Sequence, residues 1–183
     1  MLRAVVCVAF FGLLRCSEFV SPTQRTWDPS VTLSVRDVSF RDGGLALTLR
    51  RSKTDPFQAG SVIFLVPLRG RLCPVRALHK YVNLRGLDPG PLFVLQDGRF
   101  LTRQFLCALL DAALPGAVNL NTHSFRIGGA TAAARAGLPD SLIQLLGRWK
   151  SNAFKKYIRA SIHLEIAGRS AISRGLRVAP SLL

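Results

Sequence analysis

The sequence predicts an α+β domain that is mostly helical, with a small three-stranded antiparallel sheet in its N-terminal half. Three segments, 31–40, 45–50 and 61–68, alternate apolar and polar residues in the manner of strands. Most of the remaining chain consists of apolar or amphipathic segments of helical length, bounded by Pro, Gly and capping residues. With 183 residues, 49% of them hydrophobic, the chain is long enough to form one domain with a sizeable core.

The first helix is expected over Leu2–Leu14, an apolar run with a single charge. Such a run imitates a short secretory signal, but it is too short to cross a membrane as a helix. Arg15 and Glu18 follow at once, where a cleavage site requires small neutral residues. A buried helix therefore explains the run better than a signal peptide. A kink at 15–17 is expected to lead into a short second helix.

Turns and caps define the other elements. Asp42-Gly43-Gly44 is a hairpin signal between the first two strands, and a polar turn at 51–60 precedes the third. No internal repeat or domain boundary is visible, so a single domain is expected. Further helices are predicted at 74–81 (opened by Pro74), at 102–113 (capped by Thr102), between Thr122 and Gly137, at 139–147, and from Ser151 or Asn152 through Tyr157.

The charge balance favours nucleic acid as the partner. Lys and Arg total 25 against 10 Asp and Glu, which gives a net charge of +15. Neutralising backbone phosphates releases counterions, so a basic surface suits DNA or RNA. An anionic membrane surface is the weaker alternative, and a basic surface without a partner is the third.

The four cysteines do not indicate a metal site. Cys7, Cys16, Cys73 and Cys107 form no CxxC pair, and no His lies at metal-ligand spacing from them. Their surroundings are apolar, so they are interpreted as reduced core residues. No metal or other cofactor is expected.

The most informative segment is Thr122–Thr131, which contains a His-x-x-Arg pattern. His123 and Arg126 are three residues apart, so they share one face of a helix start. A His beside an Arg suits a site that holds a phosphate and moves a proton. The pattern alone is weak, but Leu-Leu-Gly-Arg-Trp-Lys-Ser (145–151) and Lys-Lys-Tyr-Ile-Arg (155–159) follow it.

Together these segments resemble the second conserved region of the tyrosine recombinase (phage integrase) family. Their amino-acid sequences are especially similar to the versions of this region in eukaryotic mobile elements of the Crypton and DIRS types. Phe11–Phe19 resembles the family's Gly-x-Arg-x-x-Glu box, and Arg51–Thr54 resembles the turn that carries its β-hairpin lysine. The resemblance covers about residues 9–160, with its motifs in the family's order.

The resemblance implies a role for each residue. Tyr157 would be the nucleophile that attacks a DNA phosphorus. Arg15 and Arg126 would hold the two non-bridging oxygens, which suits a guanidinium because it donates parallel hydrogen bonds and stays charged. Lys53 would protonate the leaving 5′ oxygen, and His123 would assist proton transfer from the tyrosine. Because the 3′-phosphotyrosine link conserves the bond energy, rejoining would need neither metal nor ATP.

One position departs from the family pattern. The family places His or Trp nine residues before the tyrosine, where this chain has Arg148, with Trp149 one residue later. Either Trp149 supplies the indole hydrogen bond, which is slightly favoured, or Arg148 binds the phosphate itself. Glu18 would support the site from behind. A phosphate-contacting or merely solvated basic face is expected from Arg135, Lys150, Lys155, Lys156 and Arg159.

The whole chain, 1–183, is interpreted as the catalytic domain of such an enzyme, truncated at its N-terminus and without the separate core-binding domain of the family. The expected function is cleavage and rejoining of double-stranded DNA, by a dimer or tetramer on the DNA and with no membrane involved. The expected location is the nucleus if the source is eukaryotic, and otherwise the cytoplasm. The alternatives are a catalytically inactive DNA-binding remnant of a mobile element and a secreted basic protein.

Overall fold

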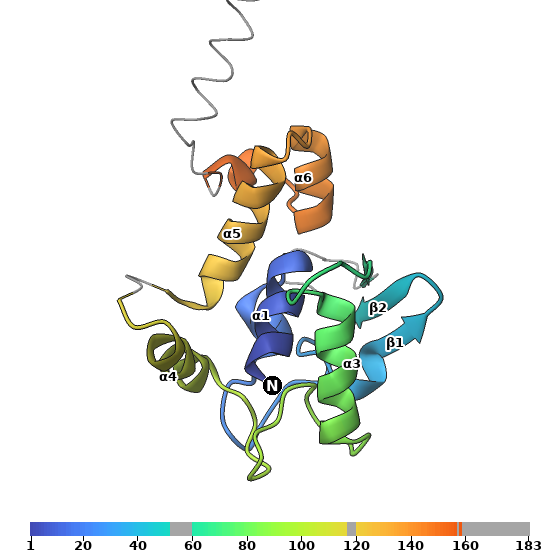
Figure 1. Cartoon of the computed structure of the whole chain (residues 1–183), viewed down its shortest axis with the longest axis vertical. Coiled ribbons are helices and arrows are strands. Elements are labelled where there is room, and N and C mark those ends of the chain that lie inside the picture. The colour runs from blue at the N-terminus through green and yellow to red at the C-terminus, as the bar shows by residue number, and fades with distance from the viewer. Residues whose placement is uncertain (52–59, 117–119, 157, 159–183) are drawn as a thin grey trace, which may run out of the picture.

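The computed structural model describes residues 1–51, 60–116, 120–156 and 158. Within them, short helices pack on one side of a small sheet (Figure 1). In chain order the elements are α1 (Leu2–Phe11), α2 (Cys16–Phe19), the 3-10 helix η1 (Val35–Asp37), β1 (Val38–Arg41), β2 (Gly44–Leu49), β3 (Ser61–Leu65), α3 (Pro74–Arg85), α4 (Arg103–Ala113), α5 (Thr122–Arg135), α6 (Asp140–Gly147) and the 3-10 helix η2 (Asn152–Lys156).

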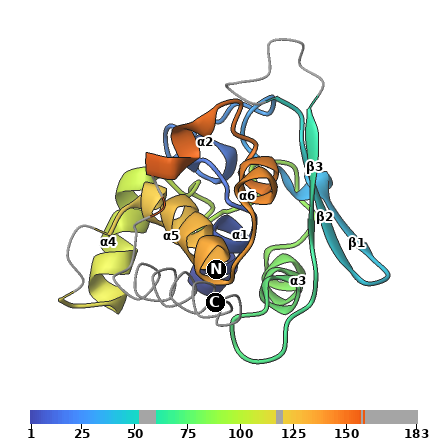
Figure 2. The ribbon, with the colours of Figure 1, turned by 90° about the horizontal axis from the view of Figure 1, so that it is seen from above.

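Helix α1 occupies the centre of the domain. Figure 2 shows the sheet edge-on at one side, followed by α3, α1, α5 and α4 with increasing distance from it. The run that imitates a signal peptide is therefore a buried helix, as predicted. All of its apolar residues are at least partly buried, which explains why this helix carries almost no charge. The fully buried members are Ala4, Val5, Cys7, Val8 and Ala9.

The three-stranded antiparallel sheet is confirmed, with the order β1-β2-β3. In the register, Phe40 faces Leu45 and Ala46 faces Phe64. The central strand β2 presents alternate leucines, Leu45, Leu47 and Leu49, to the core, and each is at most 1% exposed. This alternation is the period-2 pattern that predicted the strand.

The first strand is much shorter than predicted. The expectation was a strand over 31–40, but pairing begins only at Val38 and ends at Arg41. Before it, Asp37 accepts hydrogen bonds at Oδ2 from the Ser34 backbone N–H (2.8 Å) and from the Ser34 hydroxyl (2.7 Å). This local capping competes with a ladder and turns the chain into η1.

Several helix ends also differ from the prediction. Helix α1 ends at Phe11 rather than Leu14, α3 continues to Arg85 rather than Tyr81, and β3 ends at Leu65 rather than Leu68. The last predicted helix begins as the 3-10 helix η2.

Three residues with predicted roles, Lys53, Tyr157 and Arg159, lie outside the described residues.

Two apolar clusters hold the fold together. The large one joins α1, α3, the sheet and the segment 92–110. The smaller one lies beneath α5, α6 and η2 and consists of Leu13, Ala130, Ile143 and Phe154. The chain segment after α1 thus joins the two clusters, because Leu14 lies in the large cluster and Leu13 in the small one. No helix of the described segments is long and apolar enough to cross a membrane.

The cysteines only partly match the prediction. All four are free thiols, and Cys7 and Cys73 are buried. Cys16 and Cys107 are partly exposed and line a cavity, and Cys16 also packs against the core. Among the residues that the structure describes, no group of three or more His, Cys, Asp or Glu is placed to hold a metal ion.

Candidate active site

The site begins at the bend between α1 and α2. Helix α1 stops at Gly12, and Leu13 adopts a left-handed backbone conformation with φ of 45°. This bend exposes the Leu13 carbonyl, which accepts hydrogen bonds from Nη1 of Arg126 and from Nη2 of Arg148 (3.1 Å). The guanidinium groups of Arg126 and Arg148, from the C-terminal part of the chain, are thereby held against Leu13 in the bend between α1 and α2.

Arg15 caps α2 and forms an ion pair with Glu18. Its Nη1 lies 2.9 Å from Oε1 of Glu18, and its backbone N–H donates to Oε2 of the same carboxylate at 2.7 Å. The Arg15 guanidinium also donates to the carbonyl of Arg148 at 3.2 Å. Glu18 is 1% exposed, so this carboxylate is a buried anchor that sets the direction of the Arg15 side chain.

Arg148 shares the same carboxylate from the other side. Its Nη2 lies 3.0 Å from Oε2 of Glu18, so one carboxylate holds two guanidinium groups. Arg148 ends α6 in the left-handed conformation, with φ of 57°, which turns its side chain back toward Glu18. Burial lowers the pKa of Arg148, and the nearby Arg15 adds to this, while Glu18 opposes it. Its Nε and Nη1 are buried without a hydrogen-bond partner among the described atoms.

Arg126 is the most deeply buried arginine of the site, at 2% exposure. A buried cation is costly unless its donors and its charge are matched. Here Nη2 donates to the Gly147 carbonyl, and the Trp149 ring lies under the guanidinium, with 4.2 Å between Cζ and the ring centroid. This distance is that of a cation–π contact. Gly147 permits it, because a Cβ at this position would overlap the Trp149 ring.

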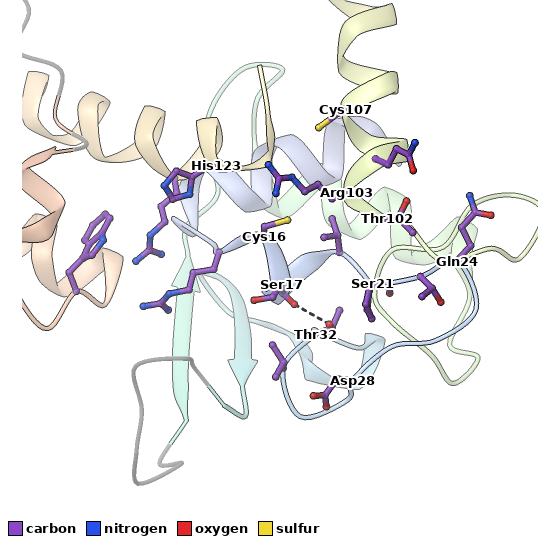
Figure 3. Close-up of a pocket in the computed structure, with 18 residues that line it drawn as sticks. Cys16, Ser17, Ser21, Gln24, Asp28, Thr32, Thr102, Arg103, Cys107 and His123 are labelled. Carbon is purple, nitrogen blue, oxygen red and sulfur yellow. Dashed lines mark hydrogen bonds between the residues drawn. The ribbon is translucent and has the colours of Figure 1, made fainter. Parts of the chain in front are cut away.

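These side chains face a cavity of about 1210 Å³ (Figure 3). Arg15, His123, Arg126 and Trp149 line one end, and the N-terminal turn of α4 lines the adjoining wall. His123 is held at the start of α5, where Oδ1 of Asn121 accepts from the His123 N–H at 2.9 Å. The cavity is therefore built by α2 and the segment 20–32 after it, by the starts of α4 and α5, and by Trp149 just after α6.

The cavity is strongly basic. Partial burial lowers the pKa of His123, and the charges of Arg126 and Arg103 lower it further. A lowered pKa keeps the imidazole neutral at physiological pH, which is the form that accepts a proton. Cys16 also lines the cavity, but burial raises the pKa of its thiol. It therefore stays protonated and is a poor nucleophile.

The structure brings together most of the predicted residues. Arg15, His123, Arg126 and Trp149 line one cavity, with Glu18 behind Arg15 and Arg148 behind Glu18. The placement fits Trp149 facing the cavity and Arg148 in a supporting position. Lys53 and Tyr157 lie outside the described residues. Of the predicted DNA-contacting face, Arg135, Lys150 and Lys155 are exposed, Lys155 pairs with Asp140 at 2.9 Å, and Lys156 belongs to η2.

Sequence reasoning missed Arg103, which lines the cavity from the first position of α4. No local motif distinguishes it from the other basic residues of the chain. Only the packing of α4 beside α5 brings it to the site.

The fold is that of known DNA recombinases. The chain is similar to the XerA recombinase, with a TM-score of 0.64 and 20% identity over 98% of this chain and 57% of that one. It is similar to the XerH site-specific recombinase in a pre-cleavage complex with its difH substrate, with a TM-score of 0.61 and 18% identity over 91% of this chain and 44% of that one. The Tn1549 transposon integrase, in a complex with circular intermediate DNA, gives a TM-score of 0.57 and 17% identity over 92% and 57%.

This chain thus has the catalytic-domain fold of the tyrosine recombinases and integrases. It spans about half the length of these proteins. No family model and no curated protein matches the sequence. The identities lie at or below 20%, so the likeness establishes the fold alone.

Proposed function

We propose that this domain cleaves and rejoins DNA strands through a 3′-phosphotyrosine intermediate, with Tyr157 as the nucleophile. One observation carries the proposal: Arg15 and Arg126, distant in sequence, line the same cavity together with His123. Recombinases and integrases share this fold. The sequence also resembles the family's motifs, in the family's order.

The site chemistry follows from the residue types. The guanidinium groups of Arg15 and Arg126 would bind the two non-bridging oxygens of one phosphodiester and stabilise the charge that grows in the transition state. The Tyr157 oxygen forms a bond to phosphorus as the bond to the 5′ oxygen breaks. Neutral His123 takes the tyrosine proton, and Lys53 gives a proton to the leaving oxygen. The reverse steps rejoin a strand, and no external energy source is needed because the phosphotyrosine retains the bond energy.

The proposed substrate is double-stranded DNA, bound by two or four copies of the protein. The resemblance of the segment 123–159 to the Crypton and DIRS types favours a mobile-element protein of a eukaryotic cell, acting in the nucleus. In a prokaryotic source the same chemistry would take place in the cytoplasm.

A covalent adduct tests this function without knowledge of the target site. The purified chain is incubated with a pool of random-sequence duplexes, each nicked so that cleavage releases a short fragment and prevents rejoining. Adducts that survive denaturation are collected and their DNA is sequenced. We expect an enriched sequence in the adducts of the wild type and no adduct with Tyr157→Phe. Binding of the pool without any adduct, for every duplex and pH tried, would refute catalysis.

The second candidate is a catalytically inactive domain that only binds DNA. The net charge of +15 favours it, because charge alone supports non-specific binding. If the domain only binds DNA, Arg126→Ala should change DNA affinity no more than the loss of any single surface charge. If the domain is a recombinase, the same variant should abolish the adduct while most of the affinity remains.

A further inference from the structure

Arg103 is a cationic group of the cavity that the proposed chemistry does not use. It is the first residue of α4, directly after the cap Thr102, whose hydroxyl accepts from the Phe105 N–H at 3.3 Å. Figure 3 shows its guanidinium pointing into the cavity, toward the side where His123 and Cys16 lie. Arg103 is exposed to solvent, and the capped helix start places its positive charge at the wall of the cavity.

Within the described chain, no carboxylate forms an ion pair with Arg103. The buried carboxylate of the site, Glu18, is already shared by Arg15 and Arg148. The acidic residue that lines the cavity is Asp28, whose Oδ1 accepts from the backbone N–H and the hydroxyl of Ser30 at 2.8 and 2.7 Å. Arg103 therefore adds a positive charge to a cavity that Arg15 and Arg126 already make basic, and like charges gathered this way favour an anionic ligand.

We propose that Arg103 binds a second phosphate of the DNA strand, next to the phosphate that Arg15 and Arg126 hold. This inference rests on the proposed function, since it takes a DNA strand as the ligand of the cavity. A second contact on the same strand would fix the direction of the backbone as well as the position of one phosphorus. Arg103 is thus a positioning residue, because it orients the strand without touching the reacting atoms.

The electrostatics of His123 agree with this placement. The charged groups that line the cavity with His123 are Arg126 from its own helix, Arg103 from α4, Arg15 at the N-cap of α2, and the carboxylate Asp28. After partial burial, Arg126 and then Arg103 lower the pKa of His123. Because Arg103 and His123 line the same cavity, a phosphate bound to the Arg103 guanidinium would lie beside the reacting groups.

The first test is the salt dependence of DNA binding by Arg103→Gln. Each phosphate contact contributes about −0.9 to the slope of log K against log salt on duplex DNA. We expect the slope of the variant to be shallower than that of the wild type by about 0.9. Arg76→Gln is the matched control, since Arg76 is an exposed arginine in the first turn of α3, outside the cavity lining. A slope equal to that of the wild type would overturn the proposal.

The second test measures the pKa of His123 by NMR titration in the free protein, with His79 and His163 as internal references. We expect the pKa of His123 to rise in Arg103→Gln and to stay unchanged in Arg76→Gln. An unchanged value in Arg103→Gln would show that the guanidinium does not face the imidazole and would overturn the placement. Neither test needs turnover, so a missing adduct refutes the proposed function alone, whereas unchanged slope and pKa refute the role of Arg103 alone.

Discussion

At the residue scale, the central feature of the site is a single buried carboxylate between two guanidinium groups. Glu18 contacts Arg15 through Oε1 and Arg148 through Oε2, at 2.9 and 3.0 Å. Such an arrangement is strongly coupled, because the loss of the carboxylate leaves two partly buried cations facing each other without compensation. Glu18 thereby controls both the stability of the bend after α1 and the direction of Arg15.

The substitution Glu18→Gln tests this coupling. The amide keeps the shape of the side chain but removes the charge, so we expect a loss of about 3 kcal/mol in the free energy of unfolding, measured by urea denaturation. The control is Asp97→Asn, which breaks an ion pair whose two side chains are 47% and 50% exposed. That pair is screened by water, so its loss should change stability little. Equal small effects of the two substitutions would contradict the role of Glu18 as an anchor.

The catalytic motif residues were predictable because their types and spacing recur in one family. His123, Arg126 and Arg15 were identified in this way, and the structure places them around one cavity. The roles of Leu13 and Gly147 were not predictable, because both act through backbone carbonyls that accept from Arg126. A carbonyl is common to every residue, and only the folded chain shows which ones turn toward a guanidinium.

At the scale of single elements, the end of α6 determines where Trp149 lies. Gly147 is buried, and a Cβ there would overlap the indole ring that lies under Arg126. The glycine is therefore required by the ring beside it rather than by its own backbone angles. Any larger residue at 147 must move either the indole or the arginine.

We expect Gly147→Ala to displace Trp149 from Arg126. In a Trp27→Phe background Trp149 is the sole tryptophan, because the chain has two. Its fluorescence emission should shift to longer wavelength as the ring moves toward water, with a loss of about 1–3 kcal/mol from overpacking. Leu145→Ala is the control on the same helix, at a side chain that is 71% exposed. Unchanged emission in Gly147→Ala would show that the ring does not rest on residue 147.

A second close contact joins α1 and α5. A Cβ on Gly129 would lie 2.6 Å from the Phe10 carbonyl oxygen, so the two helix backbones approach closely at this point. Gly129→Ala should separate α1 from α5 and move Arg126 away from the Leu13 carbonyl. We expect a loss of about 1–3 kcal/mol in thermal or urea unfolding, although alanine is the better helix former. Ala132→Ser, an exposed change on the same helix, is the control. A stabilised Gly129→Ala would refute the close packing.

The elements themselves were largely predictable where pattern and punctuation agree. Pro74, Thr102 and Gly137 mark helix ends close to their observed positions. The first strand was overestimated because 31–37 alternates like a strand, while the hydrogen bonds of Asp37 to Ser34 hold this stretch in a capped turn. A side chain that competes locally for backbone donors outweighs an alternating pattern.

At the scale of the whole molecule, the fold concentrates charge where the chain segments meet. The sheet and α3 separate Arg15 from Arg103 and Arg126 in the sequence, yet the three arginines line one cavity. Their mutual repulsion opposes folding, and a bound polyanion would relieve it. The net charge of +15 adds to this repulsion over the whole chain.

DNA binding should therefore depend steeply on salt. If the basic surface contacts six or more phosphates, affinity should fall about 10³-fold or more between roughly 50 and 200 mM salt. Fluorescence anisotropy with a labelled duplex measures this, and circular dichroism at both salt concentrations checks that the fold is retained. Tyr157→Phe should give the same slope, because a phenolic hydroxyl carries no charge to exchange for counterions. An affinity that barely changes with salt would mean that the excess of lysine and arginine does not contact the DNA backbone, and the duplex would then be excluded as the ligand of this surface.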